Sequence, residues 1–374
     1  MPESILLINY EYPPIGAGAA NAARHIAAGL RELGCEVSVL TSGFRDMNGI
    51  SHEDGICVHR VRALRKNPDK SNMIEMASFM ISASVHLPIL TRKKTFSSAL
   101  VFFSLPCGPL GLLLKGLCRT SYIISLRGGD VPGNERGLHM LHRILQPVRR
   151  LVMKNASAVV ANSNGLKELS EHADPYPVLV IPNGIDTGYF SPADASHDMF
   201  RFLFAGRFHE QKNLFFLLDQ MDAYAERSDR PFELHMAGDG PRKERLMAYA
   251  EKLRIGGRIT WHGWCDGERL RALYRSCDCL VNPSLYEGMA NVVLEAMACG
   301  IPVIASRVIG NVDLIEHGRN GYLCSLDNPM EFLEAFHRVM DPSTRSRLGR
   351  QARCTVEEKY SWGNTARAYH SLIK

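Results

Sequence analysis

The sequence lacks the short patterns that mark several large classes of enzyme. Its 374 residues contain no Asp-x-Asp pair, no Walker A sequence, no Gly-x-Ser-x-Gly and no Cys-x-x-Cys pair. These absences argue against a carboxylate-bound metal, a P-loop nucleoside triphosphatase, a serine hydrolase and a cysteine-bound zinc site. We therefore expect no metal ion and no bound cofactor.

The ten cysteines do not form a disulfide framework. Most of them are scattered through apolar runs, which is typical of a protein in the reducing cytosol. The first residues lack the basic region of a secretory signal. Residues Phe96–Cys118 could imitate a membrane span, but their glycines, prolines and Lys115 favour a strand, a turn and a helix. We predict a cytoplasmic protein without a transmembrane helix.

The net charge of +5 is confined to the first half of the chain. Residues 1–190 carry 20 Lys and Arg against 15 Asp and Glu, whereas residues 191–374 carry 24 of each. Eight of these cations form two local clusters: Arg60, Arg62, Arg65, Lys66 and Lys70, and Arg92, Lys93 and Lys94 after the apolar run Met76–Leu90. They are either solvated loops or a surface for anionic lipid or a phosphorylated acceptor. No nucleic-acid motif accompanies them, so we do not expect nucleic acid as a partner.

The length favours two α/β domains. A chain of this size exceeds one ordinary core, and short apolar strands alternate with helical stretches in both halves. Turn formers gather at Pro182–Pro192, so we place the domains at residues 1–187 and 188–359. Predicted strands are Ile5–Asn9, Glu36–Thr41, Ala99–Ser104, Tyr122–Leu126, Ala158–Ala161, Val178–Ile181, Phe202–Ala205, Glu233–Ala237, Arg258–His262, Cys279–Asn282 and Pro302–Ala305.

Two glutamates eight positions apart are the most informative feature. Glu287 follows a strand-like stretch and precedes Gly288, whereas Glu295 lies about two turns into a helix that starts at Asn291. Between them lies a helix N-terminus, which attracts anions. A ligand with hydroxyls at both ends and phosphate between them, such as a nucleotide sugar, suits this layout. Two solvated glutamates would be the alternative.

A second segment combines two cations with the end of a strand. Leu203–Gly206 is followed by Arg207, and Lys212 comes five residues later at a predicted helix start. Two cations converging on a helix N-terminus make a diphosphate-binding site plausible. Surface cations on a strand-to-helix loop would be the alternative.

Segments 283–302 and 203–213 together closely resemble the retaining glycosyltransferases of family 4, the group 1 glycosyltransferases, and a weaker similarity extends over nearly the whole chain. The resemblance implies the α/β GT-B fold, with two Rossmann-like domains facing a central cleft. The first domain would take the acceptor, the second would bind the nucleotide sugar, and a C-terminal helix at 360–374 would pack back on the first.

The resemblance also implies roles for individual residues. Glu287 would contact the donor sugar, Glu295 would hold the ribose, and Arg207 and Lys212 would stabilise the departing diphosphate without a metal. Backbone N–H groups near the sugar and diphosphate would come from Gly288, Met289, Ala290 and Asn291. The turn at Gly238 would shape the nucleotide pocket.

Two first-domain segments are less decisive. Gly16 and Gly18 follow the first strand. A nicotinamide site would need glycine or alanine where Asn21 stands and an acid at the end of the second strand, and the sequence has neither. The segment resembles the family's glycine-rich loop. Many relatives have a histidine at the position of Arg127, so Arg127 is predicted to bind phosphate and Asp130 to orient an acceptor hydroxyl. Structural turn residues are the alternative.

The predicted activity is transfer of a sugar, with retention, from a UDP- or GDP-sugar to an acceptor hydroxyl. The acceptor would be a glycan or a lipid-linked molecule of the cell envelope or an exopolysaccharide, and the enzyme could be peripheral on the inner face of the plasma membrane. A nucleotide-sugar epimerase and a non-catalytic sugar-nucleotide-binding protein are the alternatives; the intact cations and glutamates argue against the latter.

Overall fold

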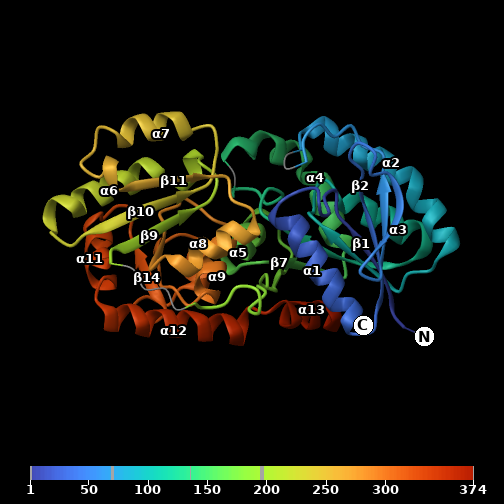
Figure 1. Ribbon diagram of the computed structural model, residues 1–374. Coiled ribbons are helices and arrows are strands. Elements are labelled where there is room, and N and C mark those ends of the chain that lie inside the picture. The colour runs from blue at the N-terminus through green and yellow to red at the C-terminus, as the bar shows by residue number, and fades with distance from the viewer. Residues whose placement is uncertain (1, 69–70, 135, 194–197, 374) are drawn as a thin grey trace. The chain divides into compact units, whose positions relative to one another are not determined.

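The computed structural model describes residues 2–68, 71–134, 136–193 and 198–373. Lys70 of the first basic cluster lies outside them. The chain divides into two compact units, one of Met1–Gly184 with Trp362–Lys374 and one of Ile185–Ser361 (Figure 1). The first join falls three residues before the predicted boundary, because Ile185 already pairs with Ser361 in the second unit.

The first unit contains an eight-stranded sheet in the order β3-β4-β2-β1-β5-β6-β7-β8. Every neighbouring pair is parallel except β3 and β4. The central strands are buried on both faces, which explains their continuous apolar sequences. The strands are β1 (Ser4–Ile8), β2 (Glu36–Ser42), β3 (Gly49–Glu53), β4 (Ile56–Val61), β5 (Ser98–Phe102), β6 (Ser121–Leu126), β7 (Ala158–Ala161) and β8 (Leu179–Val180).

Helices cover both faces of this sheet. Helices α2, α3 and α4 pack against one face of the sheet and form one hydrophobic core with it. Helices α1 and α13 pack against the opposite face and form a second core. The helices of the unit are α1 (Gly18–Glu32), α2 (Met73–Lys93), α3 (Gly108–Cys118), η1 (Arg136–Leu138), α4 (His139–Asn155), α5 (Asn164–Ala173) and α13 (Trp362–Ser371).

The C-terminal helix α13 belongs to the first unit. It packs on α1 where Gly29 faces Ala366, and a Cβ on Gly29 would lie 2.5 Å from the Cβ of Ala366. Its Tyr369 hydroxyl lies 2.7 Å from Ser125 Oγ at the end of β6. The helical structure is interrupted between Lys359 and Trp362, which separates α12 from α13.

The second unit contains a six-stranded, all-parallel sheet in the order β11-β10-β9-β12-β13-β14. Its strands are β9 (Phe200–Ala205), β10 (Phe232–Ala237), β11 (Ile259–Gly263), β12 (Cys279–Asn282), β13 (Val303–Ser306) and β14 (Gly321–Cys324). Its helices are η2 (Glu210–Lys212), α6 (Leu214–Arg227), α7 (Lys243–Ala250), η3 (Gly256–Arg258), α8 (Gly267–Ser276), α9 (Asn291–Ala298), α10 (Asn311–Leu314), α11 (Met330–Val339) and α12 (Pro342–Lys359).

The structure confirms the strand, turn and helix predicted for Phe96–Cys118, which form β5 and α3. Three strands were missed: the β3–β4 hairpin and β14. The charged residues of Glu53–Arg60 hide the hairpin, whose turn is Asp54-Gly55. Helix α2 is long and apolar enough to cross a membrane by length and composition, but core helices of soluble proteins pass the same test.

Candidate functional site

In the second unit, the segment that contains Arg207 and Lys212 and the segment that contains Glu287 and Glu295 follow neighbouring strands. Strands β9 and β12 are hydrogen-bonded and parallel, so their carboxyl ends open on the same edge of the sheet. The loop after β9 contains Arg207 and η2, and the loop after β12 contains Glu287 and leads into α9. The sheet therefore brings together residues about eighty positions apart in the sequence, at the place where parallel α/β sheets commonly bind ligands.

The two loops are joined by an ion pair and by backbone contacts. Lys212 Nζ lies 2.5 Å from Glu287 Oε1, and both side chains are largely buried. Next to this pair, the Leu285 N–H donates to the Gln211 carbonyl at 2.8 Å, and the Gln211 side-chain amide donates to the Tyr286 carbonyl at 2.9 Å. Lys212, predicted to stabilise the diphosphate, and Glu287, predicted to contact the donor sugar, are thus joined in one fixed unit.

Buried polar side chains hold Glu287 from beneath. The Ser284 hydroxyl lies 2.6 Å from Glu287 Oε1 and 2.9 Å from Asn282 Oδ1. Asn282 in turn donates to Asn311, whose amide donates to the Ser306 carbonyl at 3.0 Å. The sequence analysis missed these four residues. Their only signal was the presence of small polar residues at or shortly after the ends of two buried strands.

Backbone packing shapes the turn between Glu287 and α9. Gly310, with φ of +87°, approaches this turn so closely that a Cβ on it would lie 2.6 Å from the Gly288 carbonyl. A Cβ on Gly288 itself would meet nothing within 4 Å. Among the described residues no side chain caps α9, which follows Met289 and Ala290 and begins at Asn291. The first N–H groups of α9 are thus suited to an anion.

Glu295 lies on the second turn of α9. Its Oε2 accepts a hydrogen bond from the hydroxyl of Tyr274 on α8, at 2.8 Å. Burial raises the pKa of Glu295, and the hydrogen bond from Tyr274 acts in the opposite direction. Burial and the nearby Glu295 carboxylate also hold the pKa of Tyr274 well above its usual value, so Tyr274 remains a donor. Tyr274 was not predicted from the sequence.

Arg207 differs from Lys212 in its surroundings. Its side chain is exposed, and the described part of the chain offers its guanidinium no ion-pair partner. The loop that carries it is nevertheless fixed, because the Phe208 N–H donates to the Asp239 carbonyl at 2.8 Å. Gly238 completes this contact: a Cβ on it would lie 1.9 Å from the Gly206 carbonyl. Gly238 therefore has a packing role, whatever it contributes to a ligand.

In the first unit, the glycine-rich loop follows β1 and leads into α1, which begins at Gly18. Gly16 has φ of +96°, and a Cβ there would lie 2.4 Å from Oε2 of Glu11. Glu11 is buried, and Arg65 Nη2 lies 3.9 Å from the same oxygen. Burial raises the pKa of Glu11 to about 7, although Arg65 and the Ala17 N–H oppose the rise. Glu11 was missed because it resembles an ordinary loop acid.

Arg127 is held by the protein itself. Its guanidinium lies over the Phe102 ring, 4.2 Å from the centroid, and donates to Asn183 at 2.7 Å and to Tyr369 at 3.4 Å. Its Nε is buried and has no partner among the described residues. Burial lowers the pKa of Arg127. Arg127 thus joins β6 to the C-terminal helix, and phosphate binding by it stays a prediction.

Asp130 occupies the structural role that the sequence left as the alternative. One carboxylate oxygen accepts the N–H groups of Arg127 and Gly128, and the other accepts the N–H and hydroxyl of Ser104. Asp130 is also 3% exposed. Because its acceptor positions are occupied, the geometry favours a turn residue over one that orients an acceptor hydroxyl.

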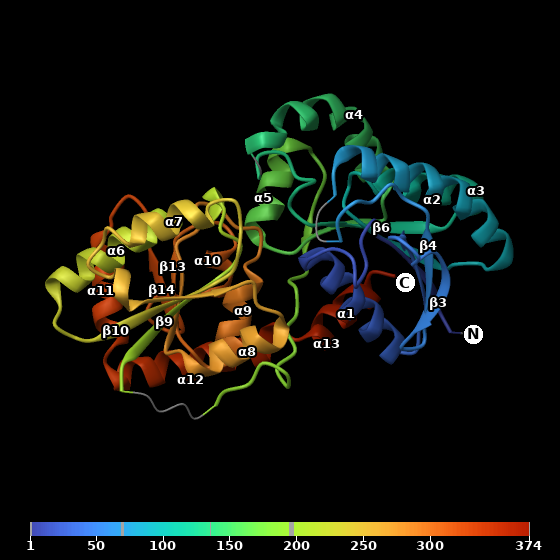
Figure 2. The same ribbon diagram turned by 45° about the horizontal axis from the view of Figure 1, so that its top comes forward.

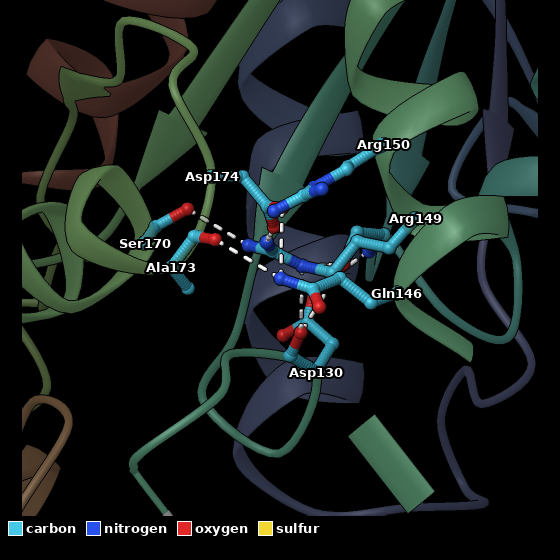
Figure 3. Close-up of polar contacts among 8 residues, drawn as sticks. Asp130, Gln146, Arg149, Arg150, Ser170, Ala173 and Asp174 are labelled. Atoms are coloured by element: carbon cyan, nitrogen blue, oxygen red, sulfur yellow. Dashed lines mark hydrogen bonds and ion pairs between the residues drawn. The ribbon is translucent and has the colours of Figure 1, made fainter. Parts of the chain in front are cut away.

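A buried ion-pair network supports this turn (Figure 3). Arg149 of α4 donates to the Asp130 carbonyl at 3.2 Å, pairs with Asp174 and donates to Ser170 at 2.8 Å. Arg150 also pairs with Asp174, at 2.6 Å. Breaking a buried ion pair by removing one partner costs about 3–5 kcal/mol. The network therefore fixes α4 against α5 and the turn at Asp130.

One group among the described residues has donor types that metals accept: Glu3, Cys35 and His370. Glu3 Oε2 lies 3.1 Å from His370 Nε2. None of the predicted site residues belongs to this group, so it has no bearing on the prediction that the site needs no metal.

Comparison with known proteins identifies the family. The model described as "Glycosyl transferases group 1" matches residues 200–341, and the model described as "Glycosyl transferase 4-like domain" matches residues 17–184. The chain is a group 1 glycosyltransferase. It is thus an enzyme that depends on a nucleotide sugar, which confirms that prediction.

Relatives match this glycosyltransferase along nearly its whole length. An "uncharacterized glycosyltransferase" of Methanocaldococcus jannaschii is 29% identical over 99% of the chain and 97% of its own. A "D-inositol 3-phosphate glycosyltransferase" of Pseudarthrobacter chlorophenolicus is 28% identical over 97% and 93%.

Solved structures show the same fold. The sucrose-phosphate synthase of Thermosynechococcus elongatus matches with a TM-score of 0.83 and 21% identity, covering 99% of this chain and 98% of its own. Anabaena HepE in complex with UDP and glucose matches with a TM-score of 0.77 and 17% identity, over 99% and 98%. The GT-B fold class predicted for this glycosyltransferase is therefore confirmed.

Proposed function

We propose that this glycosyltransferase moves a sugar from a UDP- or GDP-sugar to an acceptor hydroxyl with retention of configuration. The observation that carries the proposal is the Lys212–Glu287 pair at the carboxyl ends of β9 and β12, beside the N-terminus of α9. In this proposal Glu287 contacts the sugar, Glu295 accepts from the ribose, and Arg207 and Lys212 face the diphosphate. The UDP bound in HepE supports a uridine nucleotide by similarity.

The proposed chemistry takes place on one face of the sugar. The bond from the anomeric carbon to the phosphate oxygen breaks, and the acceptor oxygen bonds to that carbon on the same face. The acceptor proton passes to the departing phosphate oxygen, so neither a covalent enzyme intermediate nor a metal ion is required. Arg207, Lys212 and the first turn of α9 would stabilise the charge that develops on the diphosphate, and stabilisation of this kind commonly accounts for most of the rate acceleration.

Thermal stabilisation by UDP- and GDP-sugars tests the donor, because ligands of the folded state raise its melting temperature. We expect one nucleotide series to stabilise the protein and the other to have little effect. Product analysis with and without an acceptor distinguishes transfer from epimerisation. Conversion of the sugar without an acceptor would contradict the proposal, and binding without turnover of any donor would favour a sugar-nucleotide-binding protein.

We further propose that the acceptor is a glycan or lipid-linked molecule at the inner face of the plasma membrane, in cell-envelope or exopolysaccharide synthesis. The cationic excess of residues 1–190 supports this location. A water-soluble acceptor that is turned over equally well with and without vesicles would contradict it.

A further inference from the structure

The helices of the first unit that cover one face of the sheet expose rows of large apolar side chains. Along α2, Ile74, Ile81, Val85 and Ile89 are 48–71% exposed, and their spacing of seven, four and four places them on one face of the helix. No Asp, Glu, Lys or Arg occurs between Glu75 and Arg92. A solvent-facing helix normally presents charged residues there.

Helix α4 repeats this arrangement. Met140, Ile144, Val148 and Leu151 follow one another at helical spacing and are 40–76% exposed. The side of α4 that includes Arg149, Val152 and Met153 is buried. Helix α3 packs against both α2 and α4, so the three helices form one layer (Figure 2). Leu117 of α3 is also exposed. We name this layer, α2 with α3 and α4, the apolar helix layer.

The charge of the apolar helix layer has one sign. Its three helices contain seven Lys and Arg but a single acid, Glu75, which is buried and caps α2. The unit's other helices α1, α5 and α13 contain four Lys and Arg against three Glu. Exposed cations such as Arg143 and Lys154 therefore border the apolar stripe without exposed acids on the same helices.

Apolar stripes bordered by cations match an anionic bilayer. The apolar side chains can enter the boundary between headgroups and acyl chains, while long Lys and Arg side chains reach the phosphates. A protein partner would more commonly meet both signs of charge. Helix α2 lies on the membrane in this arrangement and does not cross it, because Phe79, Ala83 and Leu87 are buried in the core of the unit.

We propose that the apolar helix layer is the surface with which this enzyme docks on anionic membranes. The inference rests on the proposed membrane-side acceptor and gives that contact a location. Most of the basic clusters take no part in this contact: Arg60 and Arg65 are buried, and Lys94 pairs with Glu36 at 2.9 Å. Arg92 and Lys93 of the second cluster are exposed at the end of α2 and belong to the layer.

Co-sedimentation of the full chain with vesicles tests this docking surface. Vesicles of equal parts phosphatidylglycerol and phosphatidylcholine should bind the wild-type chain at low salt, and vesicles of phosphatidylcholine alone should bind it weakly. Binding to the anionic vesicles should fall by roughly tenfold or more in Ile144→Gln/Leu151→Gln and in Arg143→Glu/Lys154→Glu. High salt should weaken the contact because it screens exposed charges.

Matched variants control for composition and net charge. Leu33→Gln/Leu179→Gln changes two exposed apolar residues of the same unit outside the layer, and Arg350→Glu/Arg367→Glu changes the net charge equally elsewhere. Both should bind anionic vesicles as the wild type does. Equal losses in layer and control variants, or no wild-type binding to anionic vesicles, would overturn the inference.

Two further measurements distinguish membrane docking from an altered nucleotide site and from self-association of the chain. Nucleoside diphosphate binding in solution should be unchanged in all layer variants, so a failure of the proposed function would appear there and not in the vesicle assay. Sedimentation velocity without lipid should show the same species for wild type and layer variants. A wild-type dimer that Ile144→Gln/Leu151→Gln converts to a monomer would make the layer a contact between copies of the chain and overturn the membrane assignment.

Discussion

Lys212 and Glu287, 75 positions apart, form an ion pair of 2.5 Å in which the side chains are 15% and 7% exposed. The pair joins the loop after β9 to the loop after β12. A buried charge that loses its partner is destabilising, so this pair has a structural role in addition to any role with a ligand.

Lys212→Met should lower turnover on the order of a hundredfold and destabilise the second unit by about 1–3 kcal/mol, because Glu287 keeps its buried charge without a partner. Adding Glu287→Gln should restore much of the stability and none of the turnover. Urea unfolding followed by tryptophan fluorescence in a Trp362→Phe background reports on this unit, because it holds Trp261 and Trp264 whereas Trp362 belongs to the first unit. Restored turnover in the double variant would show that neither Lys212 nor Glu287 is needed for catalysis.

Arg207 should separate catalysis from stability. Its guanidinium is exposed, so Arg207→Ala should lower turnover about a hundredfold and leave the free energy of unfolding within about 0.5 kcal/mol of the wild type. Lys252→Ala, which removes another exposed cation of the same unit, should change neither quantity.

The turnover assay also tests whether the enzyme requires a metal ion. EDTA should leave the wild-type rate unchanged, because the proposed charge stabilisation comes from Arg207, Lys212 and α9. Loss of activity in EDTA that manganese restores would show that a metal ion supplies part of it.

Glu295 should govern nucleotide affinity. Glu295→Ala should weaken nucleoside diphosphate binding by roughly 1–3 kcal/mol, measured by calorimetry, because a charged hydrogen bond to the ribose is lost. Unchanged affinity would refute the ribose assignment.

Tyr274→Phe tests the same site through its pH dependence. The hydrogen bond from Tyr274 lowers the pKa of Glu295, so its removal should raise that pKa further. If the ionised carboxylate binds ribose, affinity falls as pH decreases through the pKa of Glu295, and in Tyr274→Phe this fall should begin at a higher pH. A shift toward lower pH would contradict this assignment.

The sequence predicts the fold well where local signals agree with the tertiary structure. Buried parallel strands are continuous apolar runs, so most of them were located, whereas the charged β3–β4 hairpin lies at the sheet edge and carries no such run. The sequence shows the motifs of Lys212 and Glu287 separately but does not predict that the two residues are in contact. The contact depends on β9 and β12 being neighbours, which is set by the order of strands in the sheet.

Residues that support the site were harder to predict. Asn311 and Tyr274 act through contacts with Asn282 and Glu295 that are 29 and 21 positions away in the sequence. Ser284 contacts Glu287 within the same loop. Single Ser, Asn or Tyr residues have no distinctive spacing that would mark them. Asp130 shows the reverse case: its sequence context favoured ligand binding, but four protein donors satisfy it.

Glu11 should make the stability of the first unit depend on pH. Burial raises its pKa from 4.5 to about 7, and Arg65 at 3.9 Å does not cancel the rise. The folded protein therefore holds the Glu11 proton more tightly than the unfolded chain does between these values. Stability should fall as pH rises from about 5 to about 8, by at most about 3 kcal/mol.

Glu11→Gln should abolish this part of the pH dependence and make the first unit more stable than the wild type at about pH 8, because an amide carries no charge to bury. Hydrogen exchange of β1 and α1, which flank the glycine-rich loop, measures the effect within the unit. Glu32→Gln, which alters an exposed carboxylate at the end of α1, should keep the wild-type pH dependence. A wild-type first unit that gains stability between about pH 5 and about pH 8, or a Glu11→Gln variant with an unchanged slope, would show that Glu11 is ionised throughout this range.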